Sequence, residues 1–137
     1  MIRPNLFIIL LIAIGLLGAK VSTAYALPPL PSSFYGTVKI NGANVPNDAT
    51  VSARINGIQY ATTTVMLYSG ETVYSLTVPG DDSATPEVEG GVPGNTIVFF
   101  IGIQAADQAS TWQSGTNIEL NLTAQVMVLI FLPLLVR

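Results

Sequence analysis

Apolar and polar residues alternate through most of the chain between residues 34 and 124. A period of two predicts half-buried strands, because successive side chains of a strand point to opposite faces. Val98 and Phe100 are apolar as well, so the strand over residues 96–103 is expected to be covered on both faces. The residues expected to face inward are Phe34, Val38 and Ile40; Val51, Ala53 and Ile55; Tyr74, Leu76 and Val78; Ile97, Phe99 and Ile101; and Ile118, Leu120 and Leu122.

Short turn sequences separate these predicted strands. Asn41-Gly42 and Asn56-Gly57 are typical of tight hairpin turns, because both residue types tolerate a positive φ. Residues 58–66 are rich in Thr and Val and are predicted to form one returning strand. Residues 81–94 are predicted to form a long polar loop. About seven strands at this spacing predict an all-β fold, a single antiparallel β-sandwich.

The N-terminal residues 1–26 have the pattern of a helical secretory signal peptide. Arg3 provides the positive charge, and an uninterrupted apolar run follows over residues 6–18. Ala24 and Ala26 occupy the two small-residue positions that define a cleavage site, so cleavage after Ala26 is expected. The alternative is an uncleaved membrane anchor, but the apolar run is shorter than the about 20 residues that a spanning helix needs.

The C-terminal residues 126–136 are also apolar and precede Arg137. A helix of this length would reach about half of the hydrocarbon thickness, and Pro133 would interrupt it. Two interpretations stay open, a last strand beside the domain or a short sorting or surface-association tail. The expected organisation is a signal peptide over residues 1–26, a proline-rich lead-in over 27–33, the sandwich over 34–124, and the tail or last strand over 125–137.

Composition limits the chemistry that the chain can perform. The 137 residues include no Cys and no His, and 9% are charged. These absences exclude a disulfide framework, thiol chemistry and the usual zinc ligands. Cleavage after Ala26 leaves three basic against eight acidic residues, a net charge of −5. Nucleic-acid partners are not expected, because the phosphate backbone is bound through Lys and Arg.

Acidic residues concentrate in the predicted polar loop at Asp81, Asp82, Glu87 and Glu89. Carboxylate oxygens on such a loop suit Ca²⁺, although their spacing is not that of an EF-hand. The favoured alternative is a solvated loop that keeps the protein soluble. A glycosidase-type carboxylate pair is not supported, so we expect no catalytic residues and, calcium apart, no cofactor.

Trp112 is the single tryptophan of the chain. Together with Tyr60, Tyr68 and Tyr74 it could form a stacking surface for a carbohydrate. A lone Trp in a sandwich more often fills the core or closes one end. The second interpretation is the one we expect, and ligand stacking by Trp112 is the alternative.

Four segments of the chain carry a family resemblance. A Gly-x-Val strand, a Val-Pro turn, a Thr-rich strand and a Tyr-x-Leu-x-Val-Pro strand occur at residues 36–38, 45–46, 62–64 and 74–79. Together they resemble the carboxypeptidase regulatory-like, or transthyretin-like, sandwich over about residues 34–80. The resemblance implies an Ig-like or transthyretin-like β-sandwich. Its motifs are turn and core positions, which specify the fold more than the function.

The rest of the chain resembles surface proteins in two further segments. Residues 80–99 are similar to Ig-like modules of secreted bacterial and archaeal proteins. Residues 131–137 are similar to the Leu-Pro-Leu-Val-type tails of secreted proteins in filamentous Chloroflexi, with Phe131 where those tails usually have Tyr. The resemblance implies an accessory module that holds, displays or stabilises and does not catalyse.

The expected function is therefore that of a non-enzymatic module, secreted or in the cell envelope, for structural display, adhesion or protein–protein contact. Its expected partners are an extracellular or cell-surface protein or polysaccharide, with membrane association through the ends of the chain. The alternative is a carbohydrate- or calcium-binding accessory domain. The oligomeric state stays open, including the pairing of exposed strand edges between copies.

Overall fold

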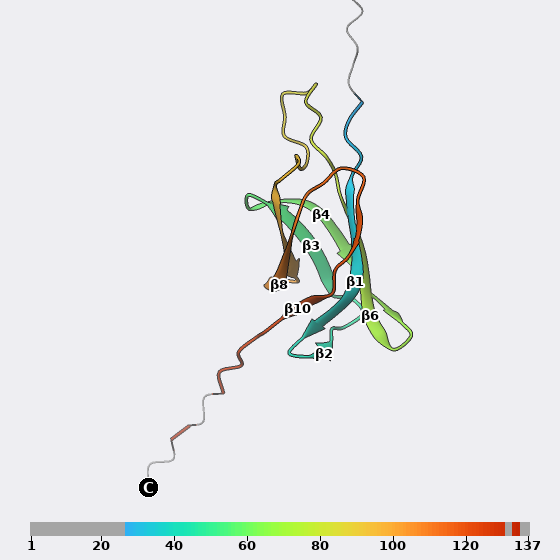
Figure 1. Cartoon of the computed structure of the whole chain (residues 1–137). Helices are drawn as coiled ribbons and strands as arrows, with labels where there is room; N and C mark the ends of the chain where they lie inside the picture. The colour runs from blue at the N-terminus through green and yellow to red at the C-terminus, as the bar shows by residue number, and fades with distance from the viewer. Residues whose placement is uncertain (1–26, 131–132, 135–137) are drawn as a thin grey trace, which may run out of the picture.

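Ten β-strands in two sheets make up the regular structure of residues 27–130 and 133–134, the part of the chain that this computed structural model describes (Figure 1). They are β1 (Ser32–Ile40), β2 (Ala43–Asn44), β3 (Thr50–Ile55), β4 (Ile58–Thr64), β5 (Met66–Tyr68), β6 (Glu71–Val78), β7 (Thr96–Ile101), β8 (Gln104–Thr111), β9 (Asn117–Glu119) and β10 (Leu122–Ala124). One sheet has the order β10-β1-β6-β5, and the short β2 and β9 also pair with β1. The other sheet has the order β4-β3-β7-β8. The predicted all-β class with two packed sheets is therefore confirmed, but the described residues form ten strands where the sequence predicts about seven.

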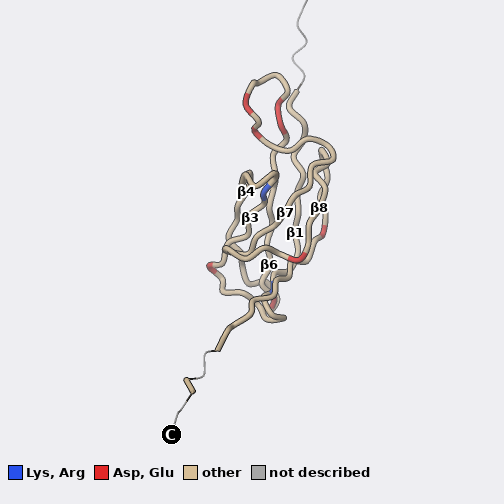
Figure 2. The backbone as a smooth tube through the Cα atoms, turned by 90° about the vertical axis from the view of Figure 1, so that its left-hand side faces the viewer, with Lys and Arg blue, Asp and Glu red and all other residues tan. Residues whose placement is uncertain are grey.

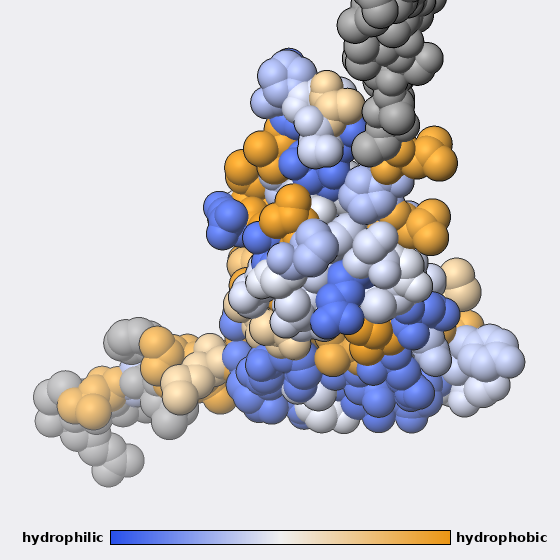
Figure 3. All heavy atoms as spheres, turned by 45° about the horizontal axis from the view of Figure 1, so that its top comes forward, coloured by the Kyte–Doolittle hydropathy of each residue, from blue (hydrophilic) through white to orange (hydrophobic). Residues whose placement is uncertain are grey.

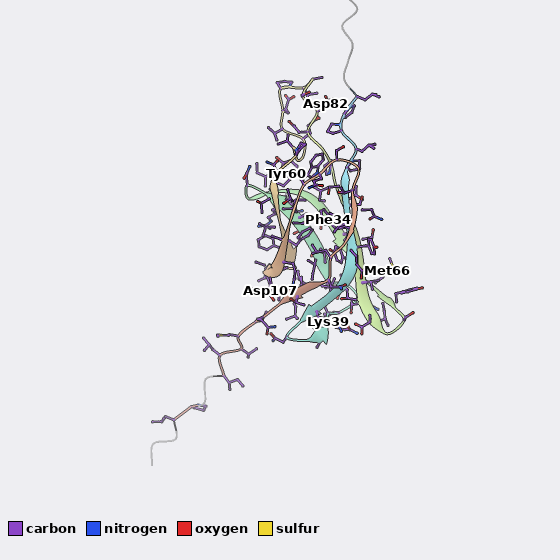
Figure 4. All side chains as sticks on the ribbon, viewed as in Figure 1. Phe34, Lys39, Tyr60, Met66, Asp82 and Asp107 are labelled. Atoms are coloured by element: carbon purple, nitrogen blue, oxygen red, sulfur yellow. The ribbon has the colours of Figure 1, made fainter. Side chains whose placement is uncertain are left out.

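The core lies between the two sheets. Phe34 of β1 meets Phe99 of β7 edge to face, with the ring centroids 5.1 Å apart, and Figure 4 shows Phe34 between the sheets. Ile40 packs against this core from the end of β1. The other residues predicted to face inward on β1, β3, β6 and β7 are all buried, which confirms the alternating pattern: Phe34, Val38, Val51, Ala53, Ile55, Tyr74, Leu76, Val78, Ile97, Phe99 and Ile101.

The tight turns occur where the sequence predicts them. Asn41 and Gly42 have φ values of 51° and 77°, and Asn56 and Gly57 have 51° and 81°. Ser69 has a positive φ as well, in the β5–β6 hairpin. Positive φ at both central residues matches the twist of a two-residue hairpin. These turns determine where β1, β3 and β5 end.

Within the part of the chain that the structure describes, no second layer covers the outer face of β7, contrary to the prediction that this strand is covered on both faces. Val98 is 37% exposed. Phe100 is partly covered by the Arg54 guanidinium group of the neighbouring β3, whose carbon lies 4.3 Å from the ring centroid. A cation over the face of an aromatic ring is favourable, and the aliphatic part of Arg covers apolar surface. The Arg54 side chain thus covers part of the apolar outer face of β7 without a further layer of secondary structure.

Residues 58–66 do not form one returning strand, and this prediction is wrong. β4 ends at Thr64 and pairs with β3, whereas β5 begins at Met66 and pairs with β6 in the other sheet. Val65 between them is buried, and its N–H donates to the carbonyl of Ala49 over 3.0 Å. Alternation stops at the crossing, where three Thr at residues 62–64 are followed by the apolar run Val65–Tyr68. Such a run does not indicate that the chain changes sheet.

The last two strands, β9 and β10, run parallel to their neighbour β1, whereas the sequence predicts an antiparallel sandwich. Both β9 and β10 pair with β1 in the parallel direction. Between them, Asn121 Oδ1 accepts hydrogen bonds from the N–H and the hydroxyl of Thr37, at 2.9 and 3.1 Å. Gly36 allows this close approach, since a Cβ there would lie 2.6 Å from the carbonyl oxygen of Leu120. Of the residues predicted to face inward here, Leu122 is fully buried and Ile118 and Leu120 are partly buried.

Neither end of the described chain forms a strand. The expected signal peptide, including Ala24 and Ala26, lies outside the described residues. In residues 27–130 and 133–134, no helix is long and apolar enough to cross a membrane. Of the proline-rich lead-in predicted over residues 27–33, residues 27–31 have no strand, whereas Ser32 and Ser33 already belong to β1.

Tyr74 connects β6 to the end of the chain. Its side chain is buried, and its hydroxyl donates a hydrogen bond to the carbonyl of Leu120 over 2.9 Å. Burial penalises the charged phenolate and so raises the pKa of Tyr74 well above its usual value. The neutral hydroxyl is therefore the form that the folded state favours.

Alkaline pH is expected to destabilise the sandwich through Tyr74. Its contribution to stability is fully present below the unfolded-state pKa of about 10, and it is lost as the pH rises through the higher pKa of the folded state. The free energy of unfolding in urea should therefore fall above about pH 10, and Tyr74→Phe should flatten this fall. Tyr35→Phe, at an exposed tyrosine, is the control and should leave the slope unchanged. An identical slope in Tyr74→Phe would contradict this role.

Candidate interaction surface

The acidic loop stands at one end of the sandwich, where Figure 2 marks the positions of its Asp and Glu residues in red. Asp81 Oδ1 accepts a hydrogen bond from the N–H of Glu89 at 2.9 Å, and Asp82 Oδ1 accepts one from the N–H of Ala84 at 2.9 Å. Glu87 and Glu89 are exposed. Among the described residues, no three acidic side chains form a group that could hold a metal ion. The two aspartates thus bind the loop's own backbone, and the two glutamates face solvent.

Trp112 lies beneath the base of this loop and has no exposed surface. Its Nε1 donates a hydrogen bond to the carbonyl of Val78 at 3.2 Å. Gly80 and Gly91, which pair in an isolated bridge, both pack against the indole. A Cβ on Gly91 would lie 2.4 Å from Trp112 Cγ. Since no face of the ring is open to a ligand, the alternative of ligand stacking by Trp112 is wrong, and the residue belongs to the core.

Gly91→Ala is expected to destabilise the protein by about 1–3 kcal/mol, because the added methyl group overlaps a buried ring that is packed from every side. Urea unfolding followed by the fluorescence of Trp112, the single tryptophan, measures both the stability and the environment of the ring. Ser83→Ala changes an exposed residue of the same loop and should leave the midpoint in place. A Gly91→Ala protein as stable as the original would show that the loop base is not packed in this way.

Two neighbouring strands present an uncharged edge to solvent, which we call the β4–β5 edge (residues 58–68). β4 is the outermost strand of its sheet and β5 the outermost strand of the other. The sequence has no charged residue between Ile55 and Gly70. Met66, Leu67 and Tyr68 are 58–68% exposed, and Figure 4 shows Met66 pointing away from the body. Natural sheet edges are usually protected from pairing by charges, Pro or bulges. Charge and Pro are both missing here, and a register shift at Tyr60 of β4 is the protection that remains.

The opposite side of the sandwich, where β8 faces β10, is closed by side chains. Gln108 Oε1 accepts from the N–H of Thr123 at 2.7 Å, and Gln108 Nε2 donates to the Thr123 hydroxyl at 2.8 Å. That hydroxyl donates to Asp107 Oδ2 at 3.0 Å. This side therefore has a side-chain hydrogen-bond network and a carboxylate at Asp107, whereas residues 58–68 of the β4–β5 edge include no charged side chain.

Residues 125–130, which we call the tail segment, continue from β10 without joining either sheet (Figure 1). The N–H of Val126 donates to Asn41 Oδ1 at 2.9 Å, and Asn41 Nδ2 donates to the carbonyl of Val126 at 3.1 Å. Beyond this point four apolar side chains are 75–93% exposed and stand clear of the sandwich in Figure 3: Met127, Val128, Leu129 and Ile130. The interpretation as a last strand packed beside the domain does not hold for this segment.

Asn41→Gly is expected to release the tail segment while preserving the hairpin. Gly accepts the positive φ of this position, but it removes both hydrogen bonds to Val126. Amide hydrogen exchange at Val126 should become about ten-fold faster, since two modest hydrogen bonds are lost. Asn56→Gly makes the same change in the other Asn-Gly hairpin and should leave that exchange rate unchanged. Unaltered exchange at Val126 in Asn41→Gly would show that Asn41 does not hold the segment.

Sequence reasoning did not single out the β4–β5 edge or the pairing of Asn41 with Val126. The run without charge from residue 55 to residue 70 is the signal that could have indicated the edge. No sequence signal relates Asn41 to a residue so far along the chain, because their contact depends on the parallel pairing of β10 with β1.

The described residues form no pocket. Comparisons with protein-family models, with curated proteins and with solved structures find no match to this chain. Function is therefore inferred from the surface of the sandwich.

Proposed function

We propose that the chain is a non-enzymatic β-sandwich module that is secreted, stays at the cell surface, and acts in structural display, adhesion or protein–protein contact. One observation carries the proposal: a well-packed sandwich exposes two apolar features, the β4–β5 edge and the tail segment. Contiguous apolar surface that a folded domain leaves exposed is typical of interaction sites.

The β4–β5 edge suits contact with an extended partner. The outer strand of a sheet offers unpaired backbone donors and acceptors, so a partner strand gains main-chain hydrogen bonds there. Met66, Leu67 and Tyr68 add apolar and aromatic side chains beside it. Because this edge has no charge, binding there requires no ion to be stripped of water, which would cost free energy.

The segments that resemble the carboxypeptidase regulatory-like sandwich support the same proposal. The Gly36-Thr37-Val38 motif lies within β1, and the Val45-Pro46 motif follows β2. The Thr-rich motif lies in β4, and the last motif lies in β6 with its Tyr, Leu and Val buried. We therefore extend the proposal to a transthyretin-like, Ig-like module, with an extracellular protein or polysaccharide as its partner.

Cell fractionation tests whether the tail segment keeps the module at the surface. The full chain is compared with a version that ends at Met127, which retains both hydrogen bonds between Asn41 and Val126. Immunoblots should find the full chain in the envelope fraction and the shortened chain in the medium. Equal thermal unfolding of the two proteins serves as the folding control. Equal release of both folded proteins into the medium would overturn the proposed surface role.

A further inference from the structure

We propose that copies of this chain join head to tail, with the tail segment of one copy adding as a strand to the outer edge of β4 in the next copy. The head-to-tail contact rests on the proposed function, because it takes the module to act through protein contact. It adds that the partner is a second copy of the chain. Two features of the molecule carry it, an exposed donor segment and an uncharged acceptor edge.

The donor is the tail segment. Its sequence, Gln-Val-Met-Val-Leu-Ile, has no charge, no Pro and no Gly, and it is rich in residues that favour strands. Four of its side chains are largely in water, which is unfavourable for apolar groups and would be relieved by packing against a sheet. Beyond Val126, which Asn41 holds, the four extended residues 127–130 span about 13 Å, enough to pair with about four residues of β4.

The acceptor is the outer edge of β4. One side of β4 pairs with β3 from Thr64 to Ile58, and the other side has no partner strand among the described residues. The other long edge strand, β8, faces Thr123 of β10 through Gln108 and Asp107. β5 has three residues, and short edges are poor templates for pairing. β4 lies beside β6 of the other sheet, and its pairing with β3 shifts register at Tyr60. It is nevertheless the long edge strand without a charged residue, and its regularly paired stretch is Ala61–Thr64.

The acceptor edge belongs to a different copy because of where the tail segment leaves the sandwich. β10 lies beside β8, and β8 and β4 lie at opposite sides of their sheet, as Figure 2 shows. Asn41 fixes the segment at Val126, so residues 127–130 would have to cross the full width of the sheet, about 14 Å for three strand spacings, to reach β4 of the same copy. They would then have too little length left to run along it.

The contact therefore uses two different surfaces of each copy. An interface of this kind is heterologous: each copy still offers a free edge and a free tail, so growth continues to a ring or an open filament. Its energetics are those of strand addition, with main-chain hydrogen bonds along β4 and side chains of the tail segment packed on the sheet.

Charge substitutions on the full chain test the proposal. Thr62→Lys places a charge on the exposed side of β4, and Val128→Lys places one in the tail segment. The molar mass from light scattering should rise with concentration in the original protein, and each substitution should weaken association about ten-fold or more. Ser75→Lys adds the same charge to an exposed position of the inner strand β6 and should leave association unchanged. Thr64→Lys is a second edge variant should Thr62→Lys fail to fold by circular dichroism.

Mixing the two variants gives the decisive measurement. The Thr62→Lys copy has an intact tail segment, and the Val128→Lys copy has an intact β4 edge. Their mixture should form dimers and stop there, because each dimer retains one blocked edge and one blocked tail. This outcome distinguishes tail-on-edge joining from pairing of two β4 edges, which Val128→Lys would not affect, and from clustering of tails, which Thr62→Lys would not affect.

Three results would overturn the proposal: a monomeric original protein, association sensitive to one of the two substitutions alone, or a mixture without dimers. If the protein stays monomeric and its tail segment binds phospholipid vesicles instead, the proposal is overturned in the same way as by the first result. Retention in the envelope fraction by a chain that is monomeric in solution would leave the proposed surface role standing and remove the head-to-tail contact. Failure of the head-to-tail contact is therefore distinguishable from failure of the proposed surface role.

Discussion

Backbone hydrogen bonds between β1 and the last two strands determine where each part of the surface lies. β1 pairs with β6 on one side and with β9 and β10 on the other. This pairing brings Thr123 against Gln108 and closes one side of the sandwich. It also leaves the two exposed features at opposite sides, with the β4–β5 edge on one and the exit of the tail segment on the other. A chain with an antiparallel last strand would leave the sandwich at the other end.

The parallel pairing depends in turn on a very close backbone approach. The carbonyl of Leu120 occupies the space beside Gly36 that any side chain would fill. Asn121 then uses its side chain to bond the backbone of Thr37, and the Tyr74 hydroxyl bonds Leu120 from the other neighbour of β1. Gly36 thus allows β1 to pair with both β9 and β10 on one side. This contact holds the C-terminal residues to the N-terminal half of the chain.

The sequence predicts the interior of this protein much better than its edges. Alternation identifies the inward face of β1, β3, β6 and β7, because a half-buried strand places every second residue in the core. Asn-Gly pairs identify two hairpins, since few other residues accept their backbone geometry. Alternation does not report which sheet a strand belongs to, so the crossing at Val65 and the parallel direction of β9 and β10 are not predicted. The apolar outer face of β7 suggested a covering layer, while a single Arg54 side chain covers Phe100 instead.

The same limits apply to the candidate surface. Trp112 and the acidic loop attract notice in the sequence because Trp and clustered carboxylates are often functional. In the structure the indole fills the space under two glycines, and Asp81 and Asp82 bind backbone N–H groups of their own loop. The β4–β5 edge has no unusual residue, and what distinguishes it is the absence of charge at a position that the topology makes the outside of a sheet. Such an edge can be identified only after the order of the strands in each sheet is known.

The pairing of Asn41 with Val126 has a mechanical consequence. A pull on the tail segment passes first through the two hydrogen bonds to Asn41 and then into β10, whose neighbour β1 runs in the same direction beside it. The load acts along these strands, so the hydrogen bonds between them share it and must yield together rather than one after another. The parallel pairing of β10 with β1 thus sets the direction in which a force on the tail segment loads the sandwich.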